Sequence, residues 1–178
     1  MEMQIFLTDY ASYNEGTQME FGHWVDLTAF SDGDELRAYI DNHFKECDRL
    51  RPLGYGNIRE EIMITDYEGL PSEMYSECGM DWDAVIEFVH LNNWEQAAVV
   101  ALLENGHTLE DAMDRREDMF LFEANSREDY WTEFEELYPD AVKASNESYF
   151  IKIDIDAFID AYNEVFWDGV TYAFDPNY

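Results

Sequence analysis

Basic residues are scarce in this chain of 178 residues, which has ten Lys and Arg against 41 Asp and Glu and a net charge of -31. Such a surface repels phosphate groups, so direct binding to nucleic acid or to an anionic membrane is disfavoured. Long apolar runs are also absent, since none approaches the roughly 18 residues of a membrane span. Residues 1–9 lack the basic start of a signal peptide. We therefore expect a cytoplasmic protein with no membrane partner.

Cysteine is nearly absent as well. Cys47 and Cys78 lie 31 positions apart without a partner motif, which disfavours both a disulfide scaffold and a thiolate metal site. The four histidines form no HExxH motif, and the GYG at residues 54–56 lacks the spacing of a phosphate-binding loop. These absences remove the common signatures of metalloenzymes and nucleotide-binding enzymes.

Two weaker patterns also fail to predict chemistry. Asp154 and Asp156 begin like a calcium-binding loop, but Phe158 stands where a ligand belongs and Ile159 where the loop needs glycine. The adjacent acids at 135–136 resemble a glycosidase pair, yet such pairs arise by chance in a chain with 41 acids. We expect a protein that is not an enzyme and that has no metal and no cofactor.

The composition nevertheless predicts a folded protein. Apolar residues make up 47% of the chain and aromatic residues 16%, too many for a disordered acidic tail. A length of 178 residues suits one ordinary domain or two to three very small ones.

Hydrophobic periodicity predicts an alternation of strands and helices. The strands expected are 4–10, 22–30, 61–67, 119–123 and 170–174, with 149–153 extended. Strands 4–10 and 22–30 should form a hairpin through the turn at 14–16. The helices expected are 32–47, a short one from residue 72, 81–91, 94–103, 108–114, 126–138 and 155–166.

These pieces predict an α+β fold made of three small subdomains. Residues 1–79 should form an antiparallel sheet plus a helix, 80–116 a helical segment, and 117–178 an antiparallel sheet plus helices. Because self-repulsion among so many like charges opposes a single sphere, we expect an elongated row of subdomains.

The acidic residues are unevenly spread. Residues 1–36 hold eight acids and 60–114 hold 14, and neither stretch contains a Lys or Arg. Like charges four residues apart on a helix cost a few tenths of a kcal/mol relative to a Glu–Lys pair. The expected pairs and stripe are Glu73 and Glu77, Asp83 and Glu87, Glu110 and Asp114, Asp129 and Glu133, and Asp156 with Asp160 and Glu164.

The number of carboxylates can be compared with the number of phosphates in duplex DNA. The duplex carries one negative charge per about 1.7 Å, so 41 carboxylates equal the phosphates of roughly 20 base pairs. We hypothesise that the acids replace phosphate electrostatically in the basic cleft of a DNA-binding enzyme. The candidate contact residues are Glu73, Glu77, Asp81, Asp83, Glu87, Glu95, Glu104, Glu110, Asp111, Asp114, Asp129, Glu133, Asp156, Asp160 and Glu164.

Two other classes of protein share this composition. A halophilic enzyme is also acidic and poor in Lys, but its charge should cover every face and its fold should fail at low salt. An acidic scaffold or chaperone for a basic protein has the same electrostatics without the geometry of DNA. Competition with duplex DNA for one groove separates the second alternative from a DNA mimic.

Several short segments resemble the ArdA family of antirestriction proteins. They are QIFLTDY at 4–10, YNEG at 13–16, GHW at 22–24, IMITDYEGL at 62–70, EDMFLF at 117–122 and the block 149–162, in the family's order. The helix expected at 32–47 and the basic loop after it look like an expansion relative to that family.

The resemblance implies a three-part, elongated mimic of bent DNA that forms a homodimer through its C-terminal part. We place the dimer interface at Tyr149, Phe150 and Ile153. The implied partner is a type I restriction-modification enzyme, blocked at its DNA-binding groove so that incoming plasmid or transposon DNA escapes cleavage.

Overall fold

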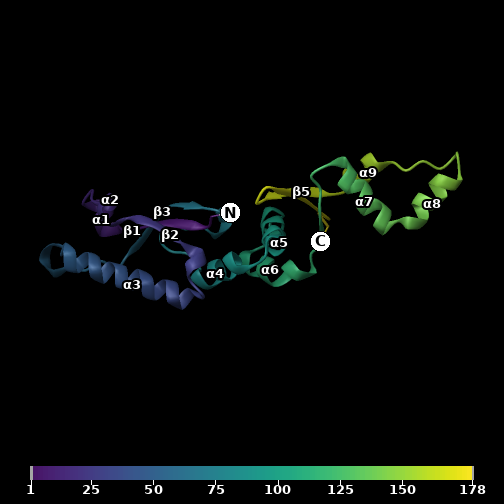
Figure 1. The fold of residues 1–178 in the computed structure, drawn as a ribbon. Coiled ribbons are helices and arrows are strands. Elements are labelled where there is room, and N and C mark those ends of the chain that lie inside the picture. The colour runs from purple at the N-terminus through teal and green to yellow at the C-terminus, as the bar shows by residue number, and fades with distance from the viewer. Residues whose placement is uncertain (1, 178) are drawn as a thin grey trace. The chain divides into compact units, whose positions relative to one another are not determined.

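The computed structural model describes residues 2–177, and the chain divides into two compact units, Met1–Leu91 and Asn92–Tyr178. Each unit contains one three-stranded antiparallel sheet together with helices (Figure 1). This confirms the expected α+β class and its two antiparallel sheets. The division into subdomains 1–79, 80–116 and 117–178 stays a prediction.

The sheet of the first unit has the order β2-β1-β3, and its strands are β1 (Gln4–Asp9), β2 (His23–Asp26) and β3 (Ile62–Glu68). The expected pairing of the first two strands is confirmed. Two short helices, α1 (Tyr10–Asn14) and α2 (Gln18–Phe21), connect them in place of the expected turn. Asp9 caps α1 by accepting a hydrogen bond from the backbone N–H of Ser12 at 2.7 Å.

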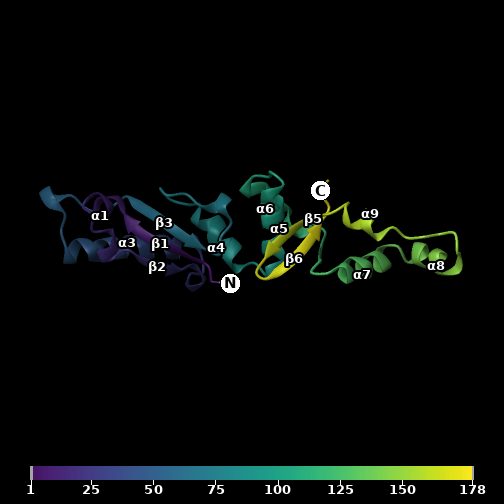
Figure 2. The ribbon, with the colours of Figure 1, turned by 90° about the horizontal axis from the view of Figure 1, so that it is seen from above.

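The longest helix, α3 (Gly33–Leu50), runs along one face of this sheet (Figures 1 and 2). Asp32 caps its start by accepting a hydrogen bond from the backbone N–H of Glu35 at 2.8 Å, and the apolar residues of one side are buried. The other helical segments of the unit are η1 (Leu27–Ala29), η2 (Gly54–Gly56), η3 (Ser72–Met74) and α4 (Trp82–His90). Because η3 is a single short turn that ends at Met74, Glu73 and Glu77 do not share a helix, which corrects the expected pair.

Strand register assigns side chains to the two faces of the first sheet. Ile5 and Val25 are opposite one another on the buried face, whereas Phe6 and Trp24 are opposite one another on the other face. A β-bulge lies in β3, because Leu7 pairs with Ile64 whereas Phe6 pairs with Asp66. Residue 65 is therefore extra, and the bulge changes which face the following side chains occupy.

The second unit has helices α5 (Asn93–Glu104), α6 (Leu109–Arg115), η4 (Arg116–Asp118), α7 (Arg127–Leu137), α8 (Pro139–Glu147) and α9 (Ile155–Ile159). Its sheet has the order β4-β6-β5, with β4 (Leu121–Glu123), β5 (Asn163–Trp167) and β6 (Val170–Phe174). Helix α5 is buried on nearly all sides, as expected. Within residues 2–177 no helix is both long and apolar enough to cross a membrane.

The helix expected at 155–166 is wrong beyond Ile159, because the chain turns back into strand β5. Val165 and Trp167 alternate as buried residues, and β5 pairs with β6 across a two-residue loop. Asp168 and Gly169 in that loop both have positive φ, 45° and 86°, the combination that a tight hairpin turn of the primed type requires. The expected helical stripe of acids in this segment therefore does not form.

The neighbouring segment also differs from its prediction. Pro139 opens helix α8, where no helix is expected from the sequence, because proline fits the first position of a helix, where no backbone N–H is needed. Tyr149 and Phe150 then form a turn rather than extended chain.

An ionic cluster is buried in the first unit. The Arg59 side chain, fully buried, lies 3.4 Å from the Asp9 carboxylate and 2.7 Å from that of Asp48. It also donates to the Ser12 hydroxyl at 3.2 Å and stacks over Phe21, with its guanidinium carbon 5.1 Å from the ring centre. These contacts join β1, α1, α2 and α3 to the loop before β3.

Replacing Arg59 should therefore be costly. We expect Arg59→Ala to lower the free energy of unfolding by about 3–5 kcal/mol, because it leaves the buried Asp9 carboxylate without a counter-charge. Urea denaturation followed by circular dichroism measures this. Arg49→Ala is the matched control, since its ion pair with Glu46 is exposed and should contribute little. Equal losses in the two variants would contradict a stabilising role for the cluster.

Candidate functional site

The predicted contact carboxylates lie mostly at the surface. All are exposed except Glu95, Asp129 and Glu133, which are half-buried. The first unit contributes Glu73, Glu77, Asp81, Asp83 and Glu87, and the second unit contributes the others. Both units therefore present acidic side chains to solvent.

Two of the like-charge pairs sit on helices as expected. Asp83 and Glu87 are exposed one turn apart on α4, and Glu110 and Asp114 are exposed one turn apart on α6. The apolar residues between them face the interior of their units. Each helix thus has an outer side with adjacent negative charges, an arrangement that opposes helix stability.

Some of the predicted contact residues have local roles in folding. Asp81 accepts a hydrogen bond from a backbone N–H at the start of α4. Glu95 and Asp129 accept from the backbone N–H groups of Asn92 and Ser126, at 3.1 and 2.7 Å, and complete two capping boxes. Helix starts therefore account for part of the acidity.

Three other predicted residues are engaged with nearby side chains. Arg37 donates to both oxygens of Asp83, at 3.2 and 2.7 Å, and Arg127 pairs with Asp156. These hydrogen bonds lower the pKa of both carboxyl groups. Glu164 accepts a hydrogen bond at 2.6 Å from the hydroxyl of Tyr130. Because Asp83 and Asp156 each have an adjacent cation, they add less net negative potential than an isolated carboxylate.

Many of the other acids lie in the first or the last turn of a helix. Carboxylates near a helix N-terminus are favoured by the helix dipole, and those near a C-terminus are disfavoured. First turns hold Asp34, Glu35, Glu110, Asp111, Glu128 and Asp140. Last turns hold Glu87, Glu104, Asp114, Glu136 and Glu147. The helix dipole disfavours a negative charge at each position of the second group.

The sequence prediction missed acidic residues on α3. Asp34, Asp41 and Glu46 are exposed on the side of this helix away from the sheet. Helical periodicity alone predicts these positions, and Arg37, Lys45 and Arg49 on the same helix distinguish it from the stretches that have no bases. Arg37 pairs with Asp34 at 2.8 Å and Arg49 pairs with Glu46, so this surface is more balanced than the others.

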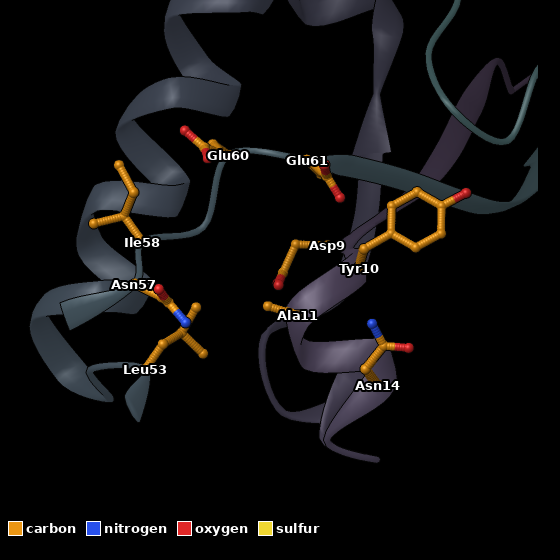
Figure 3. Close-up of a pocket in the computed structure, with 9 residues that line it drawn as sticks. All are labelled: Asp9, Tyr10, Ala11, Asn14, Leu53, Asn57, Ile58, Glu60 and Glu61. Carbon is orange, nitrogen blue, oxygen red and sulfur yellow. The ribbon is translucent and has the colours of Figure 1, made fainter. Parts of the chain in front are cut away.

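A pocket of about 530 Å³ lies between α1 and the loop that precedes β3 (Figure 3). Its walls come from Asp9, Tyr10, Ala11, Asn14, Leu53, Asn57, Ile58, Glu60 and Glu61. Asp9 is engaged with Ser12 and Arg59, so it is not placed to act as an acid or base on a ligand. In the part of the chain that the structure describes, no cluster of three or more His, Cys, Asp or Glu side chains is arranged to hold a metal ion.

The predicted dimer residues are partly exposed. Tyr149 and Phe150 are 92% and 91% exposed in the turn after α8, and their rings lie edge to face with centres 5.9 Å apart. Ile153 is half-buried. Two large exposed rings side by side are unusual on a monomer surface.

Comparison with known proteins gives one family. The family model described as "Antirestriction protein (ArdA)" matches residues 5–171, nearly the whole chain. Comparisons with curated proteins and with solved structures give no significant match.

Glu133 provides a test of charge crowding on α7. Partial burial, together with the nearby Glu136 carboxylate, raises its pKa. A carboxyl group with a raised folded-state pKa destabilises the fold once ionised, so stability falls as the pH rises through that pKa. We expect Glu133→Gln to stabilise the protein at pH 7 by a few tenths of a kcal/mol. The gain should vanish below about pH 4, where Glu133 is protonated in both states.

Thermal melts of the two proteins between about pH 3 and pH 7 measure this difference. Glu135→Gln removes an exposed charge from the same helix, so it controls for the general effect of losing one negative charge. A Glu133→Gln variant that melts no higher than the original at pH 7 would show that crowding on α7 has no effect on stability.

Proposed function

The chain belongs to the ArdA family of antirestriction proteins, and from this premise we propose that it inhibits type I restriction-modification enzymes by occupying their DNA-binding groove as a mimic of B-form DNA. It does so without catalysing a reaction. The family match supports the antirestriction activity, and the distribution of charge supports the mimicry.

The acids in the last turns of helices are the observation that carries this proposal. Glu87, Asp114, Glu136 and Glu147 are exposed where the helix dipole disfavours a negative charge. A chain selected for stability alone would hold Lys or Arg there. A basic groove in the partner would instead interact favourably with each of these carboxylates.

The physical basis of the inhibition would be the one that DNA itself uses. A basic groove that binds DNA gains free energy by releasing condensed counterions, and closely spaced carboxylates offer the same gain. The potential is a sum over many sites, so no single carboxylate should be essential. The long-range field should also speed the encounter of the two proteins.

A cleavage assay with a purified type I enzyme tests the proposal directly. Unmodified plasmid DNA should survive in the presence of the protein, and an excess of short duplex DNA should displace the protein from the enzyme. Affinity should also fall steeply as salt is added. If the protein and duplex DNA bind the enzyme together, the proposed groove is wrong and a general acidic scaffold is favoured.

Replacing carboxylates in the last turns of helices by amides distinguishes an effect of charge on inhibition from an effect of fold stability. We expect the combination Glu87→Gln, Asp114→Asn, Glu136→Gln and Glu147→Gln to raise the melting temperature, because the dipole no longer opposes these side chains. The same variant should inhibit at least about tenfold less well, since four exposed charge contacts are lost.

The matched control removes four exposed carboxylates from first turns, with Glu110→Gln, Asp111→Asn, Glu128→Gln and Asp140→Asn. It should lower the melting temperature and weaken inhibition to a similar degree. The two variants lose the same charge but should change the melting temperature in opposite directions. If the more stable variant inhibits normally and only the less stable variant inhibits poorly, the mimicry is contradicted.

We further propose that the active form is a homodimer joined through Tyr149, Phe150 and Ile153. The two exposed rings offer the kind of aromatic surface that is enriched at interfaces. Phe150→Asp should shift the sedimentation coefficient to that of a monomer, because a carboxylate cannot be buried against a second copy without a partner. Phe166→Asp is the control, an exposed ring on strand β5 outside this interface. A sedimentation coefficient that Phe150→Asp leaves unchanged would remove this assignment.

A further inference from the structure

The face of the first sheet that α3 does not cover combines aromatic rings with carboxylates. Two rows of side chains cross it, Asp26–Gln4–Glu68 and Trp24–Phe6–Asp66, each taking one residue from β2, β1 and β3 in turn. We call these six residues the open face. In Figures 1 and 2 helix α3 lies along the opposite face, and the register places all six side chains away from it.

The bulge in β3 is what places Asp66 on the open face. Ile64 pairs with Leu7 on the buried side, and regular alternation would put Asp66 on that same side two residues later. The extra Thr65 moves Asp66 to a position beside Phe6 instead. This side chain would otherwise point into the core, so the bulge is needed for the charge pattern of the open face.

The aromatic part of the open face is fixed in place. Trp24 is 38% exposed, and Phe6 meets its ring edge to face with centres 5.6 Å apart. Gly22 lies so close to Phe6 that a Cβ atom there would be 2.7 Å from the Phe6 ring. The Phe6 ring therefore packs against the backbone at Gly22 on one side and against Trp24 on another.

The carboxylates around these rings are also held in place. Gln4 donates to one oxygen of Glu68 at 2.6 Å, and Thr28 donates through its N–H and hydroxyl to one oxygen of Asp26. A pocket of about 240 Å³, lined by Glu2, Met3, Gln4, Asp26 and Thr28, adjoins this end of the open face. A fixed aromatic ring, oriented carboxylates and an acidic pocket are the complement of a long cationic side chain.

We infer that the open face is a docking site for an arginine side chain of a basic protein partner. The guanidinium group would stack on Trp24 while it donates to Asp26, two residues along the same strand, and Asp66 would add negative charge from two strands away. Arginine is favoured over lysine because its planar group stacks on an aromatic ring and donates in a fixed fork to a carboxylate. The identity of the partner rests on the proposed function, since arginines line grooves that bind DNA phosphates. This contact has no counterpart in a phosphate backbone.

Nuclear magnetic resonance of the full chain, labelled with ¹⁵N, tests the site without the enzyme. The chain has five Trp, whose indole N–H signals report on five places in one sample. We expect hexaarginine to shift the Trp24 signal at a several-fold lower concentration than hexalysine does, because both cations attract the ring but only the planar guanidinium also stacks on it and donates in a fork. Trp24→Phe identifies the signal, and half-buried Trp131 is the internal control. A Trp24 signal that responds equally to both peptides, or no more than that of Trp131, would overturn the inference.

The inhibition assay then links the site to the partner. Trp24→Leu keeps an apolar side chain without a ring, and it should weaken inhibition about fivefold to thirtyfold while the salt dependence stays the same. Tyr55→Leu, at a fully exposed ring in η2, should have no effect. Equal inhibition by the Trp24→Leu and original proteins would overturn the docking role. If hexaarginine binds as expected but the original protein inhibits no type I enzyme, the proposed function fails and the arginine site stands.

Discussion

Mutual repulsion among carboxylates is the constraint on which the rest of this structure depends. A net charge of -31 must be held by two units with small cores. The few cations are used mainly within the fold: Arg59 is buried between two carboxylates, and Arg37, Arg49, Arg51 and Arg127 pair with acids at the surface. Since ten basic residues cannot balance 41 acidic ones, the surface is left strongly negative.

The position of an acid along its helix determines whether it stabilises or destabilises that helix. At N-termini, residues such as Asp81, Glu95 and Asp129 bond to free backbone N–H groups and stabilise their helices. At C-termini the same charge is unfavourable, yet Asp114 and Glu147 are found there. Stability therefore explains part of the acidic composition. The remainder requires a reason outside the chain, and a basic partner provides one.

Local patterns in the sequence predicted much of the fold, and they failed where contacts distant in sequence decide. Helix α3 and the pairing of β1 with β2 follow from capping and periodicity. Residues 155–166 have apolar spacing that suits a helix, but hairpin pairing with β6 determines strand β5. For the site, exposure of the acids could be predicted. Their capping bonds could be anticipated from Asn92 and Ser126, whereas the position of Asp66 depends on a bulge that no spacing rule reveals.

Charge alone does not select a partner. The field of exposed carboxylates is screened within about 8–10 Å at physiological salt, and it attracts any basic protein. It raises association rates more than it lengthens the life of a complex. A rigid face that joins Trp24 to Asp26 and Asp66 acts at short range and distinguishes arginine from lysine, so it can slow dissociation from one partner. The exposed carboxylates, whose mutual repulsion the helices tolerate, would then attract the basic partner. The open face of the first sheet would slow the dissociation of the complex.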